Sequence, residues 1–248
     1  MPDLHDTGQM IRLISDWICS QINSAGASGA VLGLSGGLDS ATSAGLLVRA
    51  LGADRVLAVA MPCGSQPADE RDARLVAQAF GLRLAVIDLT EAEESLHRAL
   101  CAAGGVDGLA RSNIKPRLRM TSLYALAQSR GYLVCGNSNA AELVTGYFTK
   151  FGDSGCDFMP LAGFSKREVR LLARSLGVPT PVVEKPPSAG LRAGQTDESE
   201  MGLTYSQIDA FLEGRELDET TYRSIERKRN GSEHKRRLPA AFVPPFRL

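Results

Sequence analysis

The strongest indication of the fold is a glycine- and serine-rich segment, Gly33-Leu34-Ser35-Gly36-Gly37-Leu38-Asp39-Ser40. The apolar run 30–34 leads into it and is predicted to be a buried strand bounded by turn residues. Residues 40–50 have apolar positions at helical spacing, and Gly52 is a plausible C-cap. The glycines, serines and aspartate are therefore expected in a tight turn between a strand and the N-terminus of a helix.

A turn of this kind binds anions, because its free backbone N–H groups and the helix dipole both face outward. Gly36 and Gly37 allow the backbone to approach a phosphate chain, and Ser35 and Ser40 can donate hydroxyl hydrogen bonds. Asp39 would repel phosphate unless a divalent cation lay between them, so the pattern indicates a magnesium nucleotide. An ordinary capped loop is the alternative. It is favoured for a bare Gly-Gly loop but not for the whole Ser-Gly-Gly-Leu-Asp-Ser run.

Composition and length describe an ordinary globular protein. The 248 residues suffice for one large α/β domain or two small ones, and a formal net charge of zero gives no general attraction to nucleic acid or an anionic membrane. No stretch approaches the ~20 apolar residues of a membrane span, and the N-terminus lacks a signal-peptide pattern. The five cysteines contain no Cys-x-x-Cys pair, so we expect reduced, mostly buried thiols in a cytoplasmic protein, without zinc.

The hydrophobic pattern predicts a doubly wound parallel sheet flanked by helices on both faces. Strands are expected at 30–34, 55–61, 84–89 and 132–136. Helices are expected at 9–24, 40–50, 67–80, 91–101, 112–130 and 165–176. Residues 102–110 are expected to be a loop, and the proline-bracketed segment 179–187 a mobile loop. Ligands of such sheets bind beyond the carboxyl ends of the strands, where residues 35–40 and the segment after Gly136 would lie.

A polar segment, Asn137 to Asp157, follows the fourth expected strand and is too polar for the core. Glu142 follows that strand much as Asp39 follows the first, so the two carboxylates could hold one magnesium ion against the phosphates of ATP. An equally weighted alternative makes Glu142 a first-turn helix glutamate that the dipole stabilises. By residue type alone, Lys150 is better explained as a solvated surface lysine.

The loop at 33–40 resembles the pyrophosphate loop of the ATP pyrophosphatases, the superfamily of the asparagine, GMP and NAD synthetases and the tRNA lysidine synthetases. Ser112-Asn113-Ile114-Lys115-Pro116-Arg117-Leu118-Arg119-Met120 is similar to the Asn-x-x-Ala-Arg-x-Arg-Met signature of the NAD synthetases. Gly146-Tyr147-Phe148-Thr149-Lys150-Phe151-Gly152-Asp153 resembles their Gly-Tyr/Phe-Phe-Thr-Lys-Tyr-Gly-Asp segment. The likeness continues in the family's order through the remaining motifs, at 185–191, 194–198, 201–205 and 233–236.

This resemblance covers nearly the whole chain and implies an adenine nucleotide alpha hydrolase-like fold, with residues 1–248 as one domain that ends in a substrate-binding segment and tail. It implies a C–N bond-forming ligase that adenylates the carboxylate of deamido-NAD with ATP, releases pyrophosphate, and lets ammonia displace AMP to give NAD. The ammonia-dependent form is expected, since glutamine-dependent members carry a large N-terminal amidase domain. The resemblance further implies Mg²⁺ and a cytoplasmic homodimer, with helix 112–130 as the candidate interface.

The resemblance also assigns roles to single residues. Those matched to ATP binding are Gly33, Leu34, Ser35, Gly36, Gly37, Leu38, Asp39, Ser40, Asn137, Lys166 and Ser188. Those matched to deamido-NAD binding are Asn113, Arg117, Lys150, Asp157, His234 and Lys235. Asp39 and Glu142 match the magnesium ligands and, with Lys166, the catalytic set. Asp153 is expected where ammonia enters, because a carboxylate there could bind ammonium and help its deprotonation.

Three positions depart from the family pattern: Asn137 stands for the usual Thr, Pro116 for Ala, and Ser138 for Gly or Asp. An asparagine amide can still donate a hydrogen bond to a nucleotide. Pro116 is tolerable only in the first turn of its helix. The departures leave open a drift in substrate preference.

Other functions also stay open. The first is another adenylating ligase of the superfamily, and the second is a non-catalytic ATP sensor, against which Asp39, Glu142 and Lys166 argue. The basic runs 227–229 and 235–237 suggest a nucleic-acid patch, but zero net charge and the lack of interleaved aromatic residues disfavour one.

Overall fold

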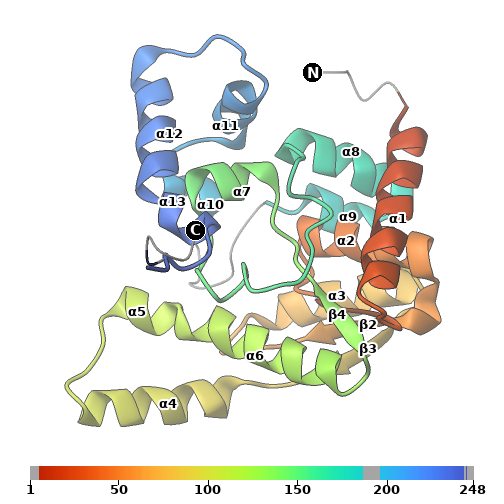
Figure 1. Ribbon diagram of the computed structural model, residues 1–248, viewed down its shortest axis with the longest axis horizontal. Coiled ribbons are helices and arrows are strands. Elements are labelled where there is room, and N and C mark those ends of the chain that lie inside the picture. Colours follow the sequence, from red (N-terminus) through yellow and green to blue (C-terminus); the bar gives the residue numbers. More distant parts are fainter. Residues whose placement is uncertain (1–5, 187–195, 243, 245–248) are drawn as a thin grey trace.

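The computed structural model describes residues 6–186, 196–242 and 244. Within these residues, four strands form one parallel sheet in the order β3-β2-β1-β4 (Figure 1). Their bounds are β1 (Gly29–Gly33), β2 (Val56–Ala60), β3 (Arg83–Val86) and β4 (Tyr132–Cys135). Ser188, one of the expected ATP ligands, lies outside the described residues.

Helices connect and cover these strands (Figure 1). Their bounds are α1 (Thr7–Ser24), α2 (Leu38–Leu51), the 3₁₀ turn η1 (Ala53–Arg55), α3 (Pro67–Ala79), α4 (Thr90–Ala102), α5 (Gly108–Ser112), α6 (Ile114–Gln128), α7 (Ala140–Thr145), α8 (Lys166–Leu176), α9 (Thr180–Glu184), α10 (Asp197–Met201), α11 (Tyr205–Leu212), α12 (Glu219–Gly231) and α13 (Glu233–Arg236).

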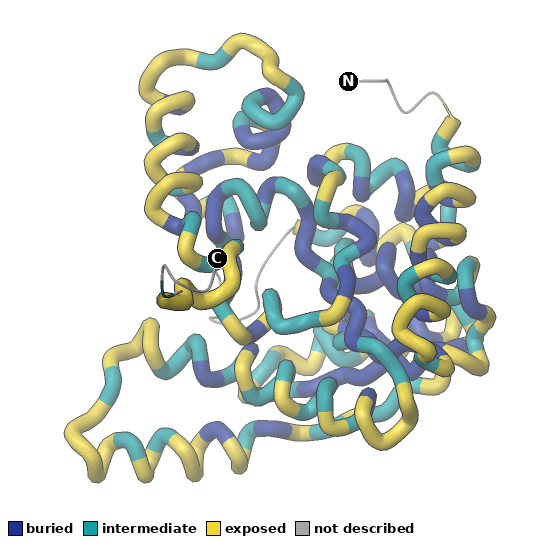
Figure 2. The backbone as a smooth tube through the Cα atoms, viewed as in Figure 1, coloured by how far each residue is buried: buried dark blue, intermediate teal, exposed yellow. Residues whose placement is uncertain are grey.

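The central strands β1 and β2 are buried, as their apolar sequences predict, whereas the edge strand β3 is partly exposed. Alternate residues of β1 enter different cores: Leu32 joins the cluster formed with α1, α2, α3, α8 and α9, whereas Val31 joins the cluster formed with α6. In Figure 2, β1 and β2 lie in the buried interior, while α4 and α5 extend away with mostly exposed residues. The doubly wound fold class is confirmed.

The order of the strands fixes where a ligand binds. The chain runs outward from β1 through β2 to β3 and then returns to place β4 on the opposite side of β1. Such a reversal leaves a crevice at the carboxyl ends of β1 and β4. The loop 34–37 follows β1 and the segment from Gly136 follows β4, so the two expected halves of the site meet there.

Three local expectations need correction. Residues 108–112 form α5, so the region 102–110 is not wholly a loop. The predicted helix 112–130 is interrupted at Asn113 and is represented by α6, in whose first turn Pro116 is the third residue, as required. Residues 180–184 form α9 rather than a mobile loop, because Pro181 is accepted in the first helical turn, where its missing N–H costs nothing. The remainder of that segment, from 187, lies outside the described residues.

A third apolar cluster lies beyond the sheet. It joins α7 to α10, α11 and α12 through buried residues such as Ala141, Met201, Ile208 and Ile225. Figure 1 shows these helices together at one end of the molecule, above the carboxyl ends of the strands. The cluster therefore fixes the C-terminal helices against the segment that follows β4.

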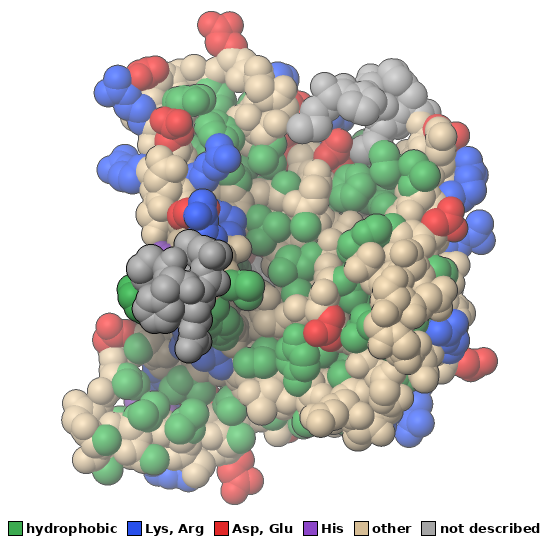
Figure 3. Space-filling view, in the orientation of Figure 1, with side chains coloured by type: hydrophobic (Ala, Val, Ile, Leu, Met, Phe, Trp, Pro, Cys, Tyr) green, Lys and Arg blue, Asp and Glu red, His purple; other side chains and the backbone are tan. Residues whose placement is uncertain are grey.

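The cysteines are all free, and no described helix is both long and apolar enough to cross a bilayer. Cys63 and Cys135 are buried and Cys19 and Cys156 are partly buried, but Cys101 is exposed on α4. On the face drawn in Figure 3, basic and acidic side chains are interspersed. This pattern matches the zero formal net charge.

Candidate active site at the ends of β1 and β4

The loop after β1 is held by its own hydroxyl groups. Ser40 Oγ accepts a hydrogen bond from the Ser35 N–H at 3.2 Å and donates one to the Gly37 carbonyl at 3.0 Å. Gly36 has φ +78°, and a Cβ there would lie 2.5 Å from the Asp69 carbonyl oxygen of α3. A larger residue therefore cannot replace Gly36 without moving the loop, since both the backbone angle and the space require glycine.

Three residues of the expected catalytic set meet at the start of α2. Asp39, in the first turn, accepts a hydrogen bond from Lys166 Nζ at 2.5 Å through Oδ2 and one from Asn139 Nδ2 at 3.2 Å through Oδ1. The Lys166 side chain is only 3% exposed. Burial by itself lowers the pKa of Lys166, but the carboxylates of Asp39 and Glu142 outweigh it and the net pKa is raised. The lysine is therefore a buried cation shared by two acids.

Glu142 has the helix-capping role offered by its sequence position, and it also lies near Asp39. It is the third residue of α7 and forms a capping box, in which Asn139 Oδ1 accepts from the Glu142 N–H at 3.1 Å and Glu142 Oε2 accepts from the Asn139 N–H at 3.2 Å. Burial and then the charge of Asp39 raise the pKa of Glu142 well above its usual range. A carboxylate can therefore cap the helix while facing a second carboxylate.

The donor set fits a magnesium ion. Asp39 and Glu142 bring hard oxygen ligands together and leave more negative charge than Lys166 neutralises. Among the described residues, no group of three or more His, Cys, Asp or Glu side chains is placed to hold a metal. Magnesium commonly takes one or two carboxylates and completes its shell with phosphate and water, so this pair suits a metal that arrives with ATP.

Asp209 of α11 is a site component that sequence reasoning missed. Its buried carboxylate accepts from the backbone N–H groups of Lys166 and Arg167, each at 3.1 Å, and so caps α8 from another helix. Ser165 adds a local cap, with Glu168 completing a capping box. The position of Lys166 is thus fixed through its main chain as well as its side chain.

We expect Asp209→Ala to lower the free energy of unfolding by about 2–4 kcal/mol, because two buried N–H groups lose their acceptor. Urea denaturation measures this loss. Asp218→Ala is the matched control, since Asp218 caps the exposed start of α12 and its removal costs about 1 kcal/mol. Equal losses in the two variants would contradict a special role for Asp209.

Asn137 connects the ends of the two strands. Its Nδ2 donates to the Gly33 carbonyl at 2.9 Å, so one amide hydrogen links the segment after β4 to the end of β1. Its Oδ1 is buried and has no hydrogen-bond partner among the described residues. A buried acceptor of this kind needs a donor, and a ligand in the crevice can supply one. The oxygen, more than the nitrogen considered from sequence, is the group available to a nucleotide.

Most residues matched to deamido-NAD form one connected surface. Thr149 Oγ1 donates to Asn113 Oδ1 at 2.7 Å, Arg117 Nη2 to the Lys150 carbonyl at 3.3 Å, and Lys150 Nζ to the His234 carbonyl at 2.6 Å. The start of α6, the segment 146–153 and α13 therefore lie side by side. Lys150 is not a freely solvated lysine.

Lys235 and Asp157 are already engaged by their own chain. Lys235 Nζ donates to the carbonyls of Gly146 and Phe148, each at 2.9 Å, and lies 5.4 Å from the centre of the Phe148 ring. Asp157 accepts from the Val134 N–H at 2.7 Å and from the Tyr124 hydroxyl at 3.0 Å. Both residues therefore fix backbone beside the crevice, whatever they contribute to a substrate.

Asp153 and Arg119 occupy the space between α6 and the end of β2. Asp153 keeps exposed surface, but its carboxylate accepts from the Thr149 N–H at 2.8 Å and burial by surrounding protein atoms raises its pKa. Arg119 Nε donates to the Met61 carbonyl at 3.1 Å, and its Nη2 donates to Ser65 Oγ at 3.3 Å. Desolvation lowers the pKa of this inward-facing arginine.

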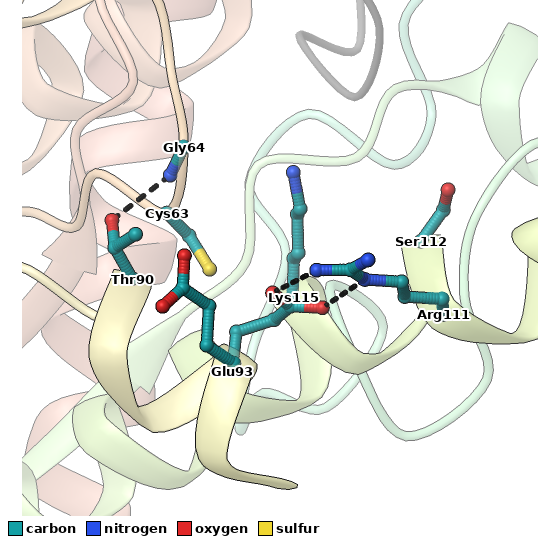
Figure 4. Close-up of a pocket in the computed structure, with 8 residues that line it drawn as sticks. Cys63, Gly64, Thr90, Glu93, Arg111, Ser112 and Lys115 are labelled. Atoms are coloured by element: carbon teal, nitrogen blue, oxygen red, sulfur yellow. Dashed lines mark hydrogen bonds and ion pairs between the residues drawn. The ribbon is translucent and has the colours of Figure 1, made fainter. Parts of the chain in front are cut away.

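A separate pocket lies between the loop after β2 and helices α4 to α6 (Figure 4). It contains an ion pair between the exposed Arg111 side chain and the buried Glu93 carboxylate, in which Arg111 Nε contacts Glu93 Oε1 at 2.8 Å and Nη2 contacts Oε2 at 3.1 Å. The hydrogen bond from Arg111 lowers the pKa of Glu93, so the glutamate stays ionised and its charge balances that of the arginine. None of the residues matched to ATP, metal or deamido-NAD lines this pocket.

Comparison with known protein families shows to which family this chain belongs. The model of the family described as NAD synthase matches residues 10–239. This chain belongs to the NAD synthase family. The NH(3)-dependent NAD(+) synthetase of Finegoldia magna is 45% identical over 232 residues, which cover 92% of this chain and 93% of that protein.

Solved structures confirm the fold of this NAD synthase family member. The NMN synthetase from Francisella tularensis is 36% identical, with a TM-score of 0.90 over 97% of this chain and 99% of that one. The NH3-dependent NAD synthetase from Campylobacter jejuni is 25% identical, with a TM-score of 0.80 over 96% of this chain and 100% of that one. The adenine nucleotide alpha hydrolase-like architecture is therefore confirmed.

Proposed function

We propose that this chain is an ammonia-dependent NAD synthetase, which uses ATP to amidate deamido-NAD and releases AMP and pyrophosphate. Membership of the NAD synthase family and the Finegoldia relative support this activity. The observation that carries the proposal is the convergence of Lys166, Asp39 and Glu142 beside the glycine loop. A free carboxylate does not react with ammonia, because hydroxide would have to leave from its carbonyl carbon. Adenylation makes AMP the leaving group instead.

The first step joins the substrate to AMP. A carboxylate oxygen of deamido-NAD forms a bond to the α-phosphorus of ATP, and the bond from that phosphorus to the bridging oxygen of pyrophosphate breaks. The Gly36 N–H and the N–H groups at the start of α2 would cradle the phosphates, while Lys166 faces their developing charge. A magnesium ion held by Asp39 and Glu142 would neutralise phosphate oxygens in this step.

The second step forms the amide. Ammonia attacks the carbonyl carbon of the adenylate, AMP leaves with the bonding electrons, and the nitrogen loses a proton. We assign Asp153 to bind ammonium and accept its proton, which leaves ammonia as the nucleophile, because the raised pKa of Asp153 makes it a stronger base than an ordinary aspartate. The second proton, which the nitrogen loses after the attack, passes to solvent. Asn113, Arg117 and Lys150 would hold the dinucleotide beside it, with His234 and Lys235 closing the surface and Asp157 supporting it.

The test is pyrophosphate release from MgATP at fixed ammonium, with and without deamido-NAD. We expect release only with deamido-NAD, and one NAD formed for each pyrophosphate. Release without that dependence would favour another adenylating ligase of the superfamily. Binding of ATP with no release under any condition would favour a sensor.

A second candidate substrate follows from the structural comparison. The Francisella structure that superposes with a TM-score of 0.90 is that of an NMN synthetase. The same chemistry would amidate the mononucleotide that carries a pyridine carboxylate. Replacing deamido-NAD by nicotinic acid mononucleotide in the same assay compares kcat/KM for the two, and a higher value for the mononucleotide would reassign the substrate.

We further propose that residues 1–248 act as one functional domain, that the protein is a homodimer, and that it works in the cytoplasm, where ATP and magnesium are available. The first two properties follow from the family likeness alone. Light scattering of the purified protein measures the assembly directly, and a monomeric mass in the presence of substrates would contradict the dimer.

A further inference from the structure

Tyr205 lies against the candidate catalytic lysine. As the first residue of α11, it places the centre of its ring 4.8 Å from Lys166 Nζ. The two side chains are almost fully buried, with Tyr205 6% exposed and Lys166 3% exposed. An ammonium over an aromatic face is attracted by the ring quadrupole, and the attraction is strongest where water is excluded.

The ring is itself held by a buried acid. The Tyr205 hydroxyl donates to Asp197 Oδ2 at 2.9 Å, and the Tyr147 hydroxyl lies between Glu200 Oε2 and Asp197 Oδ1, 3.3 Å from the latter. Burial, followed by the nearby charges of Glu142 and Asp197, raises the pKa of Tyr205, so its hydroxyl remains a donor. Donation to a carboxylate enriches the ring in electron density and strengthens its attraction for a cation.

The lysine needs a second partner because its first is shared. Lys166 Nζ donates to Asp39 Oδ2, and among the described residues no other acceptor is hydrogen-bonded to it. Asp39 is also one of the two carboxylates suited to magnesium. A carboxylate that turns toward a metal loosens its hold on an ammonium, and a buried ammonium without a partner is costly.

We propose that Tyr205 is a positioning residue, whose ring keeps the Lys166 ammonium in the crevice when Asp39 turns to a metal ion. The inference rests on the proposed function, in which Lys166 then faces the phosphates of ATP. Asp197 acts on the lysine through the ring, since it orients Tyr205 and polarises it. Helices α10 and α11, which carry Asp197 and Tyr205, thereby contribute to the site at the ends of β1 and β4.

The test compares Tyr205→Leu with Tyr205→Phe. The leucine variant loses the aromatic face, and we expect kcat for pyrophosphate release to fall about tenfold while KM for deamido-NAD stays within about twofold. The phenylalanine variant keeps the face but not the bond to Asp197, and is expected to recover kcat to within about threefold of the wild type. Tyr222→Leu is the control, because Tyr222 packs on Phe211 at 5.3 Å, is 43% exposed and lies outside the site.

Calorimetric binding of MgATP gives a readout that needs no turnover, and thermal unfolding reports whether the variants are folded. We expect the leucine variant to bind MgATP about threefold more weakly than the phenylalanine variant. Equal kcat and equal affinity in these two variants would overturn the positioning role. An inactive wild type would instead refute the proposed function, and the affinities would still decide the role of the ring.

Discussion

Asp39→Asn is expected to reduce pyrophosphate release by about 10³-fold, the largest effect of any conservative change in this chain. The amide keeps the shape of the carboxylate, so the Asn139 contact and the turn can persist. It removes the negative charge that suits a metal and that stabilises the buried Lys166 ammonium. Release of pyrophosphate at saturating MgATP and deamido-NAD measures the loss.

Asp54→Asn is the matched control for this variant. Asp54 lies on the exposed turn η1 that follows the other end of the same helix, so the same substitution there should leave kcat unchanged. Activity of Asp39→Asn within about tenfold of the wild type would exclude Asp39 as an essential ligand.

Lys166→Met is expected to lower kcat by about 10²–10³-fold, because a preorganised cation facing phosphate charge is lost. Methionine fills a similar volume in the buried site. It also leaves Asp39 and Glu142 without their shared counterion, so the pKa of Glu142 should rise further in the absence of metal. Steady-state kinetics at saturating substrates measures the first effect.

Arg167→Met is the control, since Arg167 is the next residue of α8 but pairs with Glu213 at 2.9 Å on the surface. We expect it to keep wild-type kcat. Lys166→Arg retains the positive charge but changes the shape of the group that carries it, and its kcat should lie between those of Lys166→Met and Arg167→Met. A Lys166→Met variant that turns over like Arg167→Met would remove the lysine from the mechanism.

The sheet and the first half of the site were predictable because their signals are local. A continuous apolar run followed by glycine, serine and aspartate specifies β1, its loop and the start of α2. The carboxyl-end rule for parallel sheets then predicts that Glu142 approaches Asp39. Lys166 was suggested by family likeness, and its burial shows that it is not a surface residue.

The supporting residues were not predictable, because their partners are remote in sequence. Asp197 and Tyr205 fall in the family-like segments 194–198 and 201–205, and Asp209 lies on a short amphipathic helix, but nothing local directs any of them toward Lys166. Lys235 and Asp157 carry charges that suit a ligand, yet their backbone contacts appear only in three dimensions. The helix α9 was missed because five residues with two valines are too short for a period.

The contacts at Asp39 also constrain how this protein is made. Asn139 is 100 residues further along the chain and Lys166 is 127 residues further. Contacts between residues this far apart in sequence form slowly, because the chain loses loop-closure entropy before the contact stabilises it. During synthesis on the ribosome, the first strand, its glycine loop and α2 therefore emerge long before the residues that complete them. A nascent chain carries the phosphate loop before it carries Glu142 and Lys166, so we expect unfinished chains to catalyse no adenylation.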